Sequence, residues 1–350
     1  MRRYAYVGCY TTENRKANGK GIKVYEIEGE NSWKLIQTVN QAANPSFLCF
    51  DREEKFLYSI HGDLCEINSF SIDRKTGMLA HLNSSSTEGY NPVHLTVDKT
   101  NRWIFVANLQ TGTVAVIPRN ENGTLGMCRN LYLIDGKVSS TFSHPHSVFQ
   151  DPYGEFLFVS CQGRENGFGQ VVVFRIDSKE GVLNKTCVLK SREIAEPRHM
   201  VCMPDGIHCY GINERDYTIT SYLFDRDLGI LHPYQIVSSL PDNVTEEGWA
   251  SGIICDPNHK FIIISNRKHD SISSFCIDET TGKLNICDCI KTGGKNPRFI
   301  GWDPFSQCIL AANEISGDIR EFSIDKSGIL KFSGFHLNTE SPACVIFSEQ

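Results

Sequence analysis

Charged and imidazole side chains stand at both ends of one short segment of this sequence, EPRHMVCMPDGIHCYGINE (residues 196–214). Arg198 and His199 open the segment and Glu214 closes it, around a Pro-Asp-Gly turn. A carboxylate or an imidazole can remove a proton from water, and a guanidinium group can stabilise an oxyanion or bind an anionic group. The segment therefore has the residue types of a catalytic or anion-binding site, provided that the fold brings its two ends together.

Segments of the same type recur along the chain about every 50 residues, which is a period typical of a β-propeller blade. Each has an apolar strand, a turn and a second apolar strand, and a proline stands at the start of all but one, where Ala250 takes its place. The segments begin at Asn44, Asn91, His144, Glu196, Trp249 and Asn296. A second hairpin follows, with turns such as SIDRKTGML and CIDETTGKL, so each repeat contains about four strands.

The two ends of the chain complete one further unit. The C-terminal SPACVIFSEQ supplies a proline and a first strand, and the N-terminal YAYVGCY supplies a second strand. Their pairing would remove the open edge that a chain of blades leaves. The sequence therefore predicts an all-β fold, a seven-bladed β-propeller with four-stranded antiparallel blades, closed by pairing of the N- and C-terminal strands and forming a single domain over residues 1–350.

This architecture predicts where the polar groups meet. The start of a blade's first strand and the end of its second strand lie at the same mouth of the central channel. Ionisable residues hold these positions in neighbouring blades: His146, Arg198, Arg298, Glu214, Arg267 and Glu314, with His144 and His199 directly beside them. We predict that these side chains converge on one side of the mouth, where a ligand would bind. The alternative is a solvent-exposed set of charges or simple ion pairs, such as Arg298 with Glu314.

A metal site is the less favoured interpretation of the histidines. His144, His146 and His199 offer three nitrogen ligands, but no carboxylate stands at metal-ligand spacing with them, and the nearby arginines would repel a cation. No Gly-rich phosphate loop, serine nucleophile motif or dinucleotide fingerprint is present in the sequence. We therefore expect a metal-free anion site and no cofactor.

Composition narrows the choice of partners and compartment. The net charge of -6 makes nucleic acid and an anionic membrane unfavourable partners. No apolar run approaches the ~20 residues of a membrane span. The start MRRYAYVGCYTTENRK has no apolar stretch like that of a signal peptide. We expect a cytoplasmic protein, and the sequence does not indicate its oligomeric state.

The chain contains 14 cysteines. Most lie in strand-like runs, such as Cys202 in HMVCM and Cys255 in GIICD, where they resemble small buried hydrophobic residues. Cys287 and Cys289 point to one face of an alternating segment, and no second pair completes a zinc ribbon. We predict reduced, structural thiols in a reducing compartment.

The repeats also carry a family resemblance. The most telling stretches are GCYTT…GKGIKVYEI, VANLQTGTVAVIPRNENGTL, SHPHSVFQDPYGEFLFV, EPRHMVCMPDGIHCYGINE, ISNRKHDSISSF and GGKNPRFIGWDPFSQCILAANE. In this order they resemble, over essentially the whole chain, the seven-bladed lactonase family. That family contains the bacterial propeller-type 6-phosphogluconolactonases and the fungal carboxy-muconate cyclising enzymes. The resemblance implies a site formed by His146, Arg198, Glu214 and Arg267.

Three functions follow as hypotheses. The first is a metal-independent lactonase of carbohydrate metabolism, in which His146 or Glu214 activates water and Arg198 and Arg267 stabilise the oxyanion. The substrate would be a small anionic lactone or polycarboxylate, bound with the help of His144, His199, Arg298 and Glu314. The second is a lactonising cycloisomerase that acts on a carboxy-muconate at the same site. The third is a non-catalytic, ligand-binding propeller.

Overall fold

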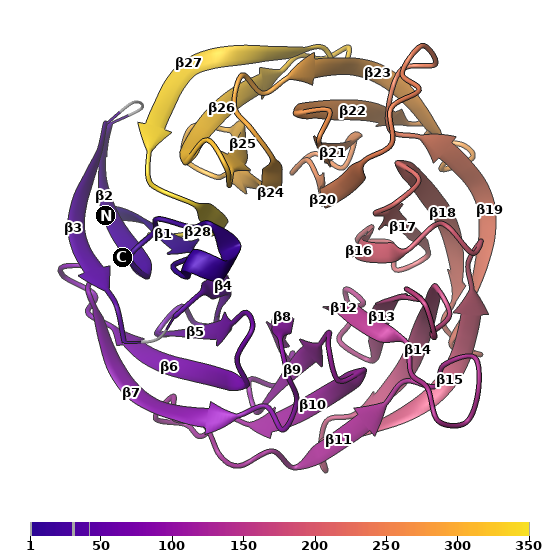
Figure 1. Ribbon diagram of the computed structural model, residues 1–350, viewed down its shortest axis with the longest axis horizontal. Coiled ribbons are helices and arrows are strands. Elements are labelled where there is room, and N and C mark those ends of the chain that lie inside the picture. Colours follow the sequence, from indigo (N-terminus) through magenta and orange to yellow (C-terminus); the bar gives the residue numbers. More distant parts are fainter. Residues whose placement is uncertain (1, 30–31, 42, 350) are drawn as a thin grey trace.

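The computed structural model describes residues 2–29, 32–41 and 43–349. Within these residues the chain forms 28 β-strands and one short 3-10 turn, η1 (Glu13–Arg15). The strands build seven antiparallel sheets of four strands each, arranged around a central axis as Figure 1 shows. The predicted seven-bladed propeller is therefore confirmed. None of the described helical segments has the length and apolar character needed to cross a membrane.

Each blade runs from an inner strand at the axis to an outer strand at the perimeter. Blade 1 contains β4 (Pro45–Phe50), β5 (Phe56–His61), β6 (Glu66–Ile72) and β7 (Leu79–Ser86), and blade 2 contains β8 (Pro92–Val97), β9 (Trp103–Asn108), β10 (Thr113–Pro118) and β11 (Asn130–Leu133). Blade 3 contains β12 (His144–Gln150), β13 (Phe156–Gln162), β14 (Gln170–Asp177) and β15 (Val182–Lys190), and blade 4 contains β16 (Pro197–Cys202), β17 (His208–Asn213), β18 (Thr218–Asp225) and β19 (Ile230–Ser238). Blade 5 contains β20 (Trp249–Cys255), β21 (Phe261–Arg267), β22 (Ser271–Ile277) and β23 (Leu284–Lys291), and blade 6 contains β24 (Pro297–Asp303), β25 (Cys308–Asn313), β26 (Asp318–Ile324) and β27 (Leu330–Asn338).

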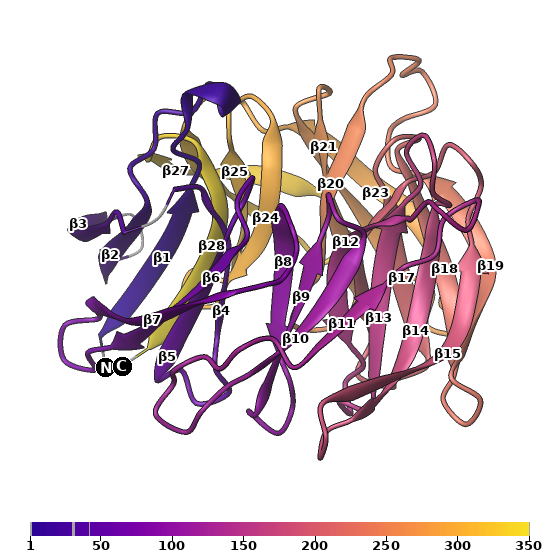
Figure 2. The ribbon, with the colours of Figure 1, turned by 60° about the horizontal axis from the view of Figure 1, so that its bottom comes forward.

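Blade 7 closes the ring by joining the two ends of the chain. It contains β28 (Pro342–Glu349), β1 (Arg3–Cys9), β2 (Ile22–Gly29) and β3 (Ser32–Val39). β1 and β28 pair antiparallel, with Arg3 opposite Glu349 and Cys9 opposite Pro342. The two termini consequently lie side by side at one face of the ring (Figure 2). This pairing confirms the closure that the sequence predicts.

The repeated aspartate of the sequence forms the turn between the first and second strands of a blade. Asp51 Oδ1 accepts hydrogen bonds from the backbone N–H groups of Lys55 (2.7 Å) and Phe56 (2.9 Å). Asp151 and Asp256 make the same pair of bonds in blades 3 and 5. An Asp side chain at this place closes the turn locally, which explains why the residue recurs at blade spacing.

The hydrophobic core lies between neighbouring blades. Phe105 of blade 2, for example, packs in one cluster with Leu157, Val159 and Val172 of blade 3, and all four side chains are essentially fully buried. Similar clusters follow around the ring. Burial of these apolar faces fixes each blade against the next, so the loops at the blade ends are held in defined positions.

A β-bulge stands at the start of the inner strand. In blade 4 the pairing passes from Pro197 opposite Asn213 to His199 opposite Ile212, so Arg198 has no partner across the ladder. The same shift leaves His146 and Arg298 unpaired in blades 3 and 6. A bulge re-aims a side chain and interrupts the ladder. The residue after the proline, which the sequence singles out, is therefore the bulged residue at the mouth of the channel.

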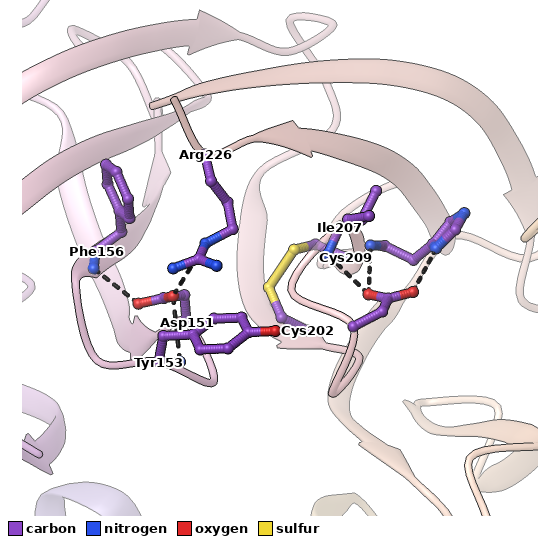
Figure 3. Close-up of a disulfide and its surroundings, with 9 residues drawn as sticks. Asp151, Tyr153, Phe156, Cys202, Ile207, Cys209 and Arg226 are labelled. Atoms are coloured by element: carbon purple, nitrogen blue, oxygen red, sulfur yellow. Dashed lines mark hydrogen bonds and ion pairs between the residues drawn. A yellow bond between two sulfur atoms is a disulfide. The ribbon is translucent and has the colours of Figure 1, made fainter. Parts of the chain in front are cut away.

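One prediction about the cysteines is wrong. Cys202 was expected to be a reduced thiol, but it forms a disulfide with Cys209. The two residues lie directly opposite each other in β16 and β17, with 4.1 Å between their Cα atoms, so the hairpin register brings the sulfur atoms together. Figure 3 shows the bond beside Ile207, at the turn end of the hairpin. None of the other twelve cysteines takes part in a disulfide among the described residues.

Candidate active site

Seven of the eight predicted site residues gather at one mouth of the channel, on the face away from the termini. We call this set the mouth cluster: His146, Arg198, His199, Glu214, Arg267, Arg298 and Glu314. They come from the starts of β12, β16 and β24 and from the ends of β17, β21 and β25 in blades 3 to 6. Figure 2 shows these strand ends at the face opposite the N- and C-termini. The contacts below describe how the set is held together.

Glu214 is the link between blades 4 and 5. Its Oε2 atom lies 3.0 Å from Arg198 Nε and 3.0 Å from Arg267 Nη2. The Arg198 Nη1 group donates to the carbonyl of Ser251 at 2.7 Å, and Arg267 Nη2 donates to the carbonyl of Ala250 at 3.2 Å. Both guanidinium groups are therefore fixed by the backbone of β20 as well as by the shared carboxylate. Such fixed, buried cations can stabilise a negative charge without reorganising.

A second ion pair, from blade 6, lies beside the first. Arg298 Nη1 lies 3.6 Å from Glu314 Oε2, and the amide of Asn296 donates to the same oxygen at 2.9 Å. The Arg298 guanidinium also stands 5.1 Å from the ring centroid of Tyr10, and the Arg15 guanidinium stands 4.3 Å from that ring. Tyr10 extends the mouth cluster towards blade 7. Tyr10 stands at the repeat position that Glu214 and Glu314 hold in blades 4 and 6. It was not among the predicted site residues because that prediction used charged residues and histidines.

The histidines of the cluster lie beneath the arginines. The rings of His146 and His199 are 5.3 Å apart, and His199 Nε2 lies 3.3 Å from Arg198 Nη1. His146 is only 5% exposed, and its Nδ1 atom has no hydrogen-bond partner among the described residues. A buried nitrogen without a partner is costly to keep, so this atom is a candidate for contact with a ligand or a water molecule.

His144 is held differently from the other seven residues. Its Nδ1 atom lies 2.8 Å from the carbonyl oxygen of Leu109, and its ring packs edge-on against Phe142 at 5.2 Å. It pairs with Gln162 across the β12–β13 ladder. The structure thus places His144 at the joint between blades 2 and 3, and among the described residues it has no hydrogen bond or ring contact with the mouth cluster.

Electrostatics separates the two candidate bases. Burial alone would raise the pKa of the Glu214 carboxyl, but the positive charges of Arg267, Arg198 and Arg298 outweigh it and lower that pKa below its ordinary value. Burial, followed by the charge of Arg198, holds the pKa of His146 well below its ordinary value. At neutral pH, Glu214 is consequently an anion bound between arginines, and His146 is a neutral imidazole.

Aromatic rings close the channel under the mouth cluster. Phe47 stacks on His94 with 4.2 Å between ring centroids, and it stands 6.3 Å from His199 and 6.5 Å from Phe299. Below these rings lies a cavity of about 500 Å³ with mainly apolar walls, which include Trp302. The lining of this cavity also includes His199 and Arg298, so these two side chains belong both to the mouth cluster and to the cavity wall.

The donor set of the mouth does not suit a metal ion. Among the described residues, no group of three or more His, Cys, Asp and Glu side chains is placed to hold a cation. Three arginines of the mouth cluster, each within 3.6 Å of a glutamate oxygen, are donors suited to an anionic group.

Comparison with known proteins agrees with this geometry. Residues 4–347 match the model of a family described as lactonase, 7-bladed β-propeller. The chain belongs to the seven-bladed β-propeller lactonase family. Within it, a 6-phosphogluconolactonase of Bacillus subtilis is 27% identical over 356 residues, which cover 99% of this chain and 98% of the relative. A 6-phosphogluconolactonase of Formosa agariphila is 28% identical over 338 residues, covering 91% of this chain and 92% of the relative.

Solved structures of the lactonase family have the same fold. A Bacteroides fragilis protein suggested to be a 6-phosphogluconolactonase superposes with a TM-score of 0.87 at 27% identity, covering 99% of this chain and 98% of its own. A periplasmic gluconolactonase of Pseudomonas aeruginosa gives a TM-score of 0.88 at 24% identity, covering 100% of this chain and 99% of its own. The second likeness concerns the fold alone.

Proposed function

We propose that this protein hydrolyses a sugar-type lactone at the mouth cluster, without a metal ion. The observation that carries the proposal is the arrangement of Glu214 between Arg198 and Arg267, beside a buried His146 nitrogen that has no partner among the described residues. This arrangement lies in a chain of the lactonase family, and relatives that match it nearly end to end are 6-phosphogluconolactonases.

In the proposed reaction, the arginines bind the carbonyl oxygen of the lactone. A water molecule attacks the carbonyl carbon while the neutral His146 imidazole accepts one of its protons. Negative charge develops on the carbonyl oxygen and is stabilised by the guanidinium groups of Arg198 and Arg267. The bond between the carbonyl carbon and the ring oxygen then breaks, the ring oxygen takes up a proton, and a hydroxy acid is released.

The surroundings of Glu214 support His146 as the base of this reaction. A base needs a lone pair that is free to accept a proton, and Glu214 Oε2 is already engaged by two cations. We therefore assign Glu214 the task of holding Arg198 and Arg267 in place. The low pKa of His146 makes it a weak base, and its value lies in being neutral and correctly placed at the operating pH.

The arginines favour a substrate that carries a carboxylate or a phosphate, and therefore a small anionic lactone or polycarboxylate. Because Glu214 and Glu314 already pair with these arginines, an anionic substrate has to compete with them. Phosphorylated and unphosphorylated sugar lactones are both to be compared for this reason. A cytoplasmic location is proposed along with this function, and there the Cys202–Cys209 disulfide would be exposed to a reducing environment.

The test is an assay of purified protein, treated with a chelator, on glucono-1,5-lactone, its 6-phosphate and a carboxy-muconate. We expect ring opening of at least one sugar lactone above the spontaneous rate, and no change of that rate on chelation. Cyclisation of the carboxy-muconate without hydrolysis of any lactone would assign the lactonising reaction instead. Inactivity on all three substrates would support a non-catalytic propeller and contradict the proposal.

A further inference from the structure

Glu196 stands in an unusual backbone conformation for its residue type. It precedes Pro197 with φ of 56°, in the left-handed region. The equivalent positions of three other blades hold Asn44 (50°), Asn91 (57°) and Asn296 (60°). Asparagine is one of the few residues besides glycine that enter this region readily, and glutamate is not. Glu54, Glu88 and Glu340 also have positive φ, so the conformation of Glu196 directs attention to its side-chain contacts and does not by itself identify a function.

One oxygen of Glu196 does what the asparagines do elsewhere. Glu196 Oε1 accepts a hydrogen bond from the backbone N–H of Arg164 at 2.8 Å. Asn91 Oδ1 accepts the corresponding bond from the N–H of Asp63 at 3.0 Å. In both blades the bond ties the loop of the preceding blade to the start of the inner strand. An asparagine would satisfy this structural need, so the need does not explain the glutamate.

The second oxygen of Glu196 has no such explanation. In blade 1 the amide nitrogen of Asn44 donates to the carbonyl of Gly62 at 3.1 Å. Glu196 Oε2 is buried and has no hydrogen-bond partner among the described residues, and the whole residue is only 7% exposed. Among the described residues this carboxylate forms no ion pair, unlike that of Glu214, although the charge of Arg164 acts to lower its pKa. A buried carboxyl oxygen without a partner favours the protonated form of the acid.

Glu196 shares a cavity with Glu214. A hollow of about 360 Å³ at the mouth is lined by both residues, with Gln162 and Trp249 on its walls. The backbone N–H of Glu214 donates to the carbonyl of Glu196 at 2.8 Å, which fixes the two residues beside each other. Glu196 also lines the neighbouring hollow. The charged groups around the pair are Arg164, Glu165 and Arg215 in the shared hollow, and Glu193, Asp216, Glu247 and Lys268 in the neighbouring one.

The two carboxyl groups have opposite electrostatic environments. Burial raises the pKa of Glu196 above its ordinary value, the charge of Glu214 raises it further, and the N–H groups of Arg164 and Gly163 act against the increase. The arginines lower the pKa of Glu214. Two acids in one site with pKa values moved apart are the usual arrangement for an acid and its charged partner.

We propose that Glu196 is a proton donor of this site, delivering the proton of its Oε2 to the oxygen that leaves the lactone carbonyl. The inference rests on the proposed hydrolysis. The attacking water forms the new carbon–oxygen bond and gives one proton to His146. The ring carbon–oxygen bond breaks, its electron pair stays on the ring oxygen, and that oxygen takes the proton from Glu196. Exchange with solvent then returns the proton from His146 and restores the Glu196 acid.

The test compares three variants for kcat, KM, pH profile and urea unfolding. In Glu196→Asn the structural hydrogen bond and the left-handed backbone are accommodated as in the other blades, so we expect equal or higher stability and a kcat lowered at least tenfold. Glu196→Gln should lose kcat similarly and should lose the fall of kcat/KM at rising pH that the wild type shows. Glu155→Gln, which changes an exposed carboxylate at the turn end of blade 3, should behave as the wild type.

An active wild type with an unchanged Glu196→Asn rate would overturn this inference and leave the proposed function standing. A wild type that hydrolyses no lactone would overturn the proposed function and the transfer step with it. NMR titration of a chain with ¹³C-labelled glutamate carboxyl groups gives a readout independent of activity. The pKa values of Glu54 and Glu321 are also raised, so we expect several glutamate carboxyl groups that titrate above the ordinary range, one of which is absent in Glu196→Asn. A spectrum of Glu196→Asn that has lost none of these titrations contradicts the inference.

Discussion

The Oε2 atom of Glu214 lies 3.0 Å from Arg198 Nε and 3.0 Å from Arg267 Nη2, so a single oxygen joins the guanidinium groups of two blades. Both arginines are almost completely buried, so water cannot solvate their charges if the carboxylate is removed. The geometry of the mouth therefore depends on this one side chain.

Replacement of Glu214 by glutamine should lower both stability and activity. Loss of one partner of a buried ion pair costs about 3 kcal/mol of unfolding free energy. Misplaced arginines should reduce kcat by about 100-fold, as removal of an oxyanion-stabilising group does. Urea unfolding and lactone hydrolysis measure the two effects, with Glu155→Gln as the control. Wild-type kcat in Glu214→Gln would show that Glu214 does not position the arginines for catalysis.

His146→Asn tests the proposed base. The substitution keeps a polar side chain of similar reach but removes the imidazole, and loss of a general base reduces kcat by roughly 100- to 10,000-fold. His208→Asn is the matched control, because His208 pairs with Asp205 at the opposite end of the hairpin and lies far along the strand from the mouth. Equal activity of the two variants would exclude His146 as the base.

The buried histidines should make the fold sensitive to acid. Burial, together with the charge of Arg198, lowers the pKa of His94 to about 3, whereas an unfolded histidine titrates near about 6.5. Between these values the unfolded chain binds a proton that the folded chain does not, so stability falls as pH falls below about 6.5, by up to about 1.4 kcal/mol per pH unit for this residue.

His94→Phe checks this effect, because phenylalanine retains the ring that stacks on Phe47. Urea unfolding of the wild type and the variant at pH 4.5, 5.5, 6.5 and 7.5 should show a shallower loss of stability at low pH in the variant. Parallel curves for the two proteins would mean that His94 titrates normally in the folded chain.

The Cys202–Cys209 disulfide predicts a defined thiol count. Alkylation of the unfolded, oxidised chain should modify twelve cysteines, and alkylation after reduction should modify all 14. Closing so short a loop stabilises the fold by about 2 kcal/mol in the chain-entropy model. Mass spectrometry of the alkylated chain gives the count, and modification of all cysteines before reduction would show that the bond does not form.

Much of the fold and of the mouth cluster was predictable because the chain is a repeat. Aligning the repeats placed Arg198 and Glu214 at equivalent strand ends, and a propeller holds such ends at one mouth. The contacts themselves were not predictable. The sharing of one Glu214 oxygen by two arginines depends on side-chain rotamers and on the carbonyls of β20, which no spacing in the sequence encodes.

Two features were missed for different reasons. The disulfide follows from the hairpin register, since Cys202 and Cys209 stand at equal distances from the turn. The prediction of reduced thiols considered only the apolar character of the strands and not this register. Glu196 was missed because the residue before the proline has a structural role in most blades. That its Oε2 atom lacks a hydrogen-bond partner among the described residues follows only from the three-dimensional structure. The spacing of residues in the sequence predicts which face or end of a strand they occupy. Which buried polar atoms lack a hydrogen-bond partner is known only from the three-dimensional structure.

The most direct test of the whole account is kcat/KM for lactone hydrolysis by Arg198→Gln, measured beside Arg226→Gln. Arg226 lies beside Asp151 at the turn end of the blades (Figure 3), and it also pairs with Glu155. We predict a decrease of at least about 100-fold for Arg198→Gln, with the folded state retained, and little change for Arg226→Gln. A folded Arg198→Gln protein with wild-type kcat/KM would contradict the assignment of the mouth cluster as the active site.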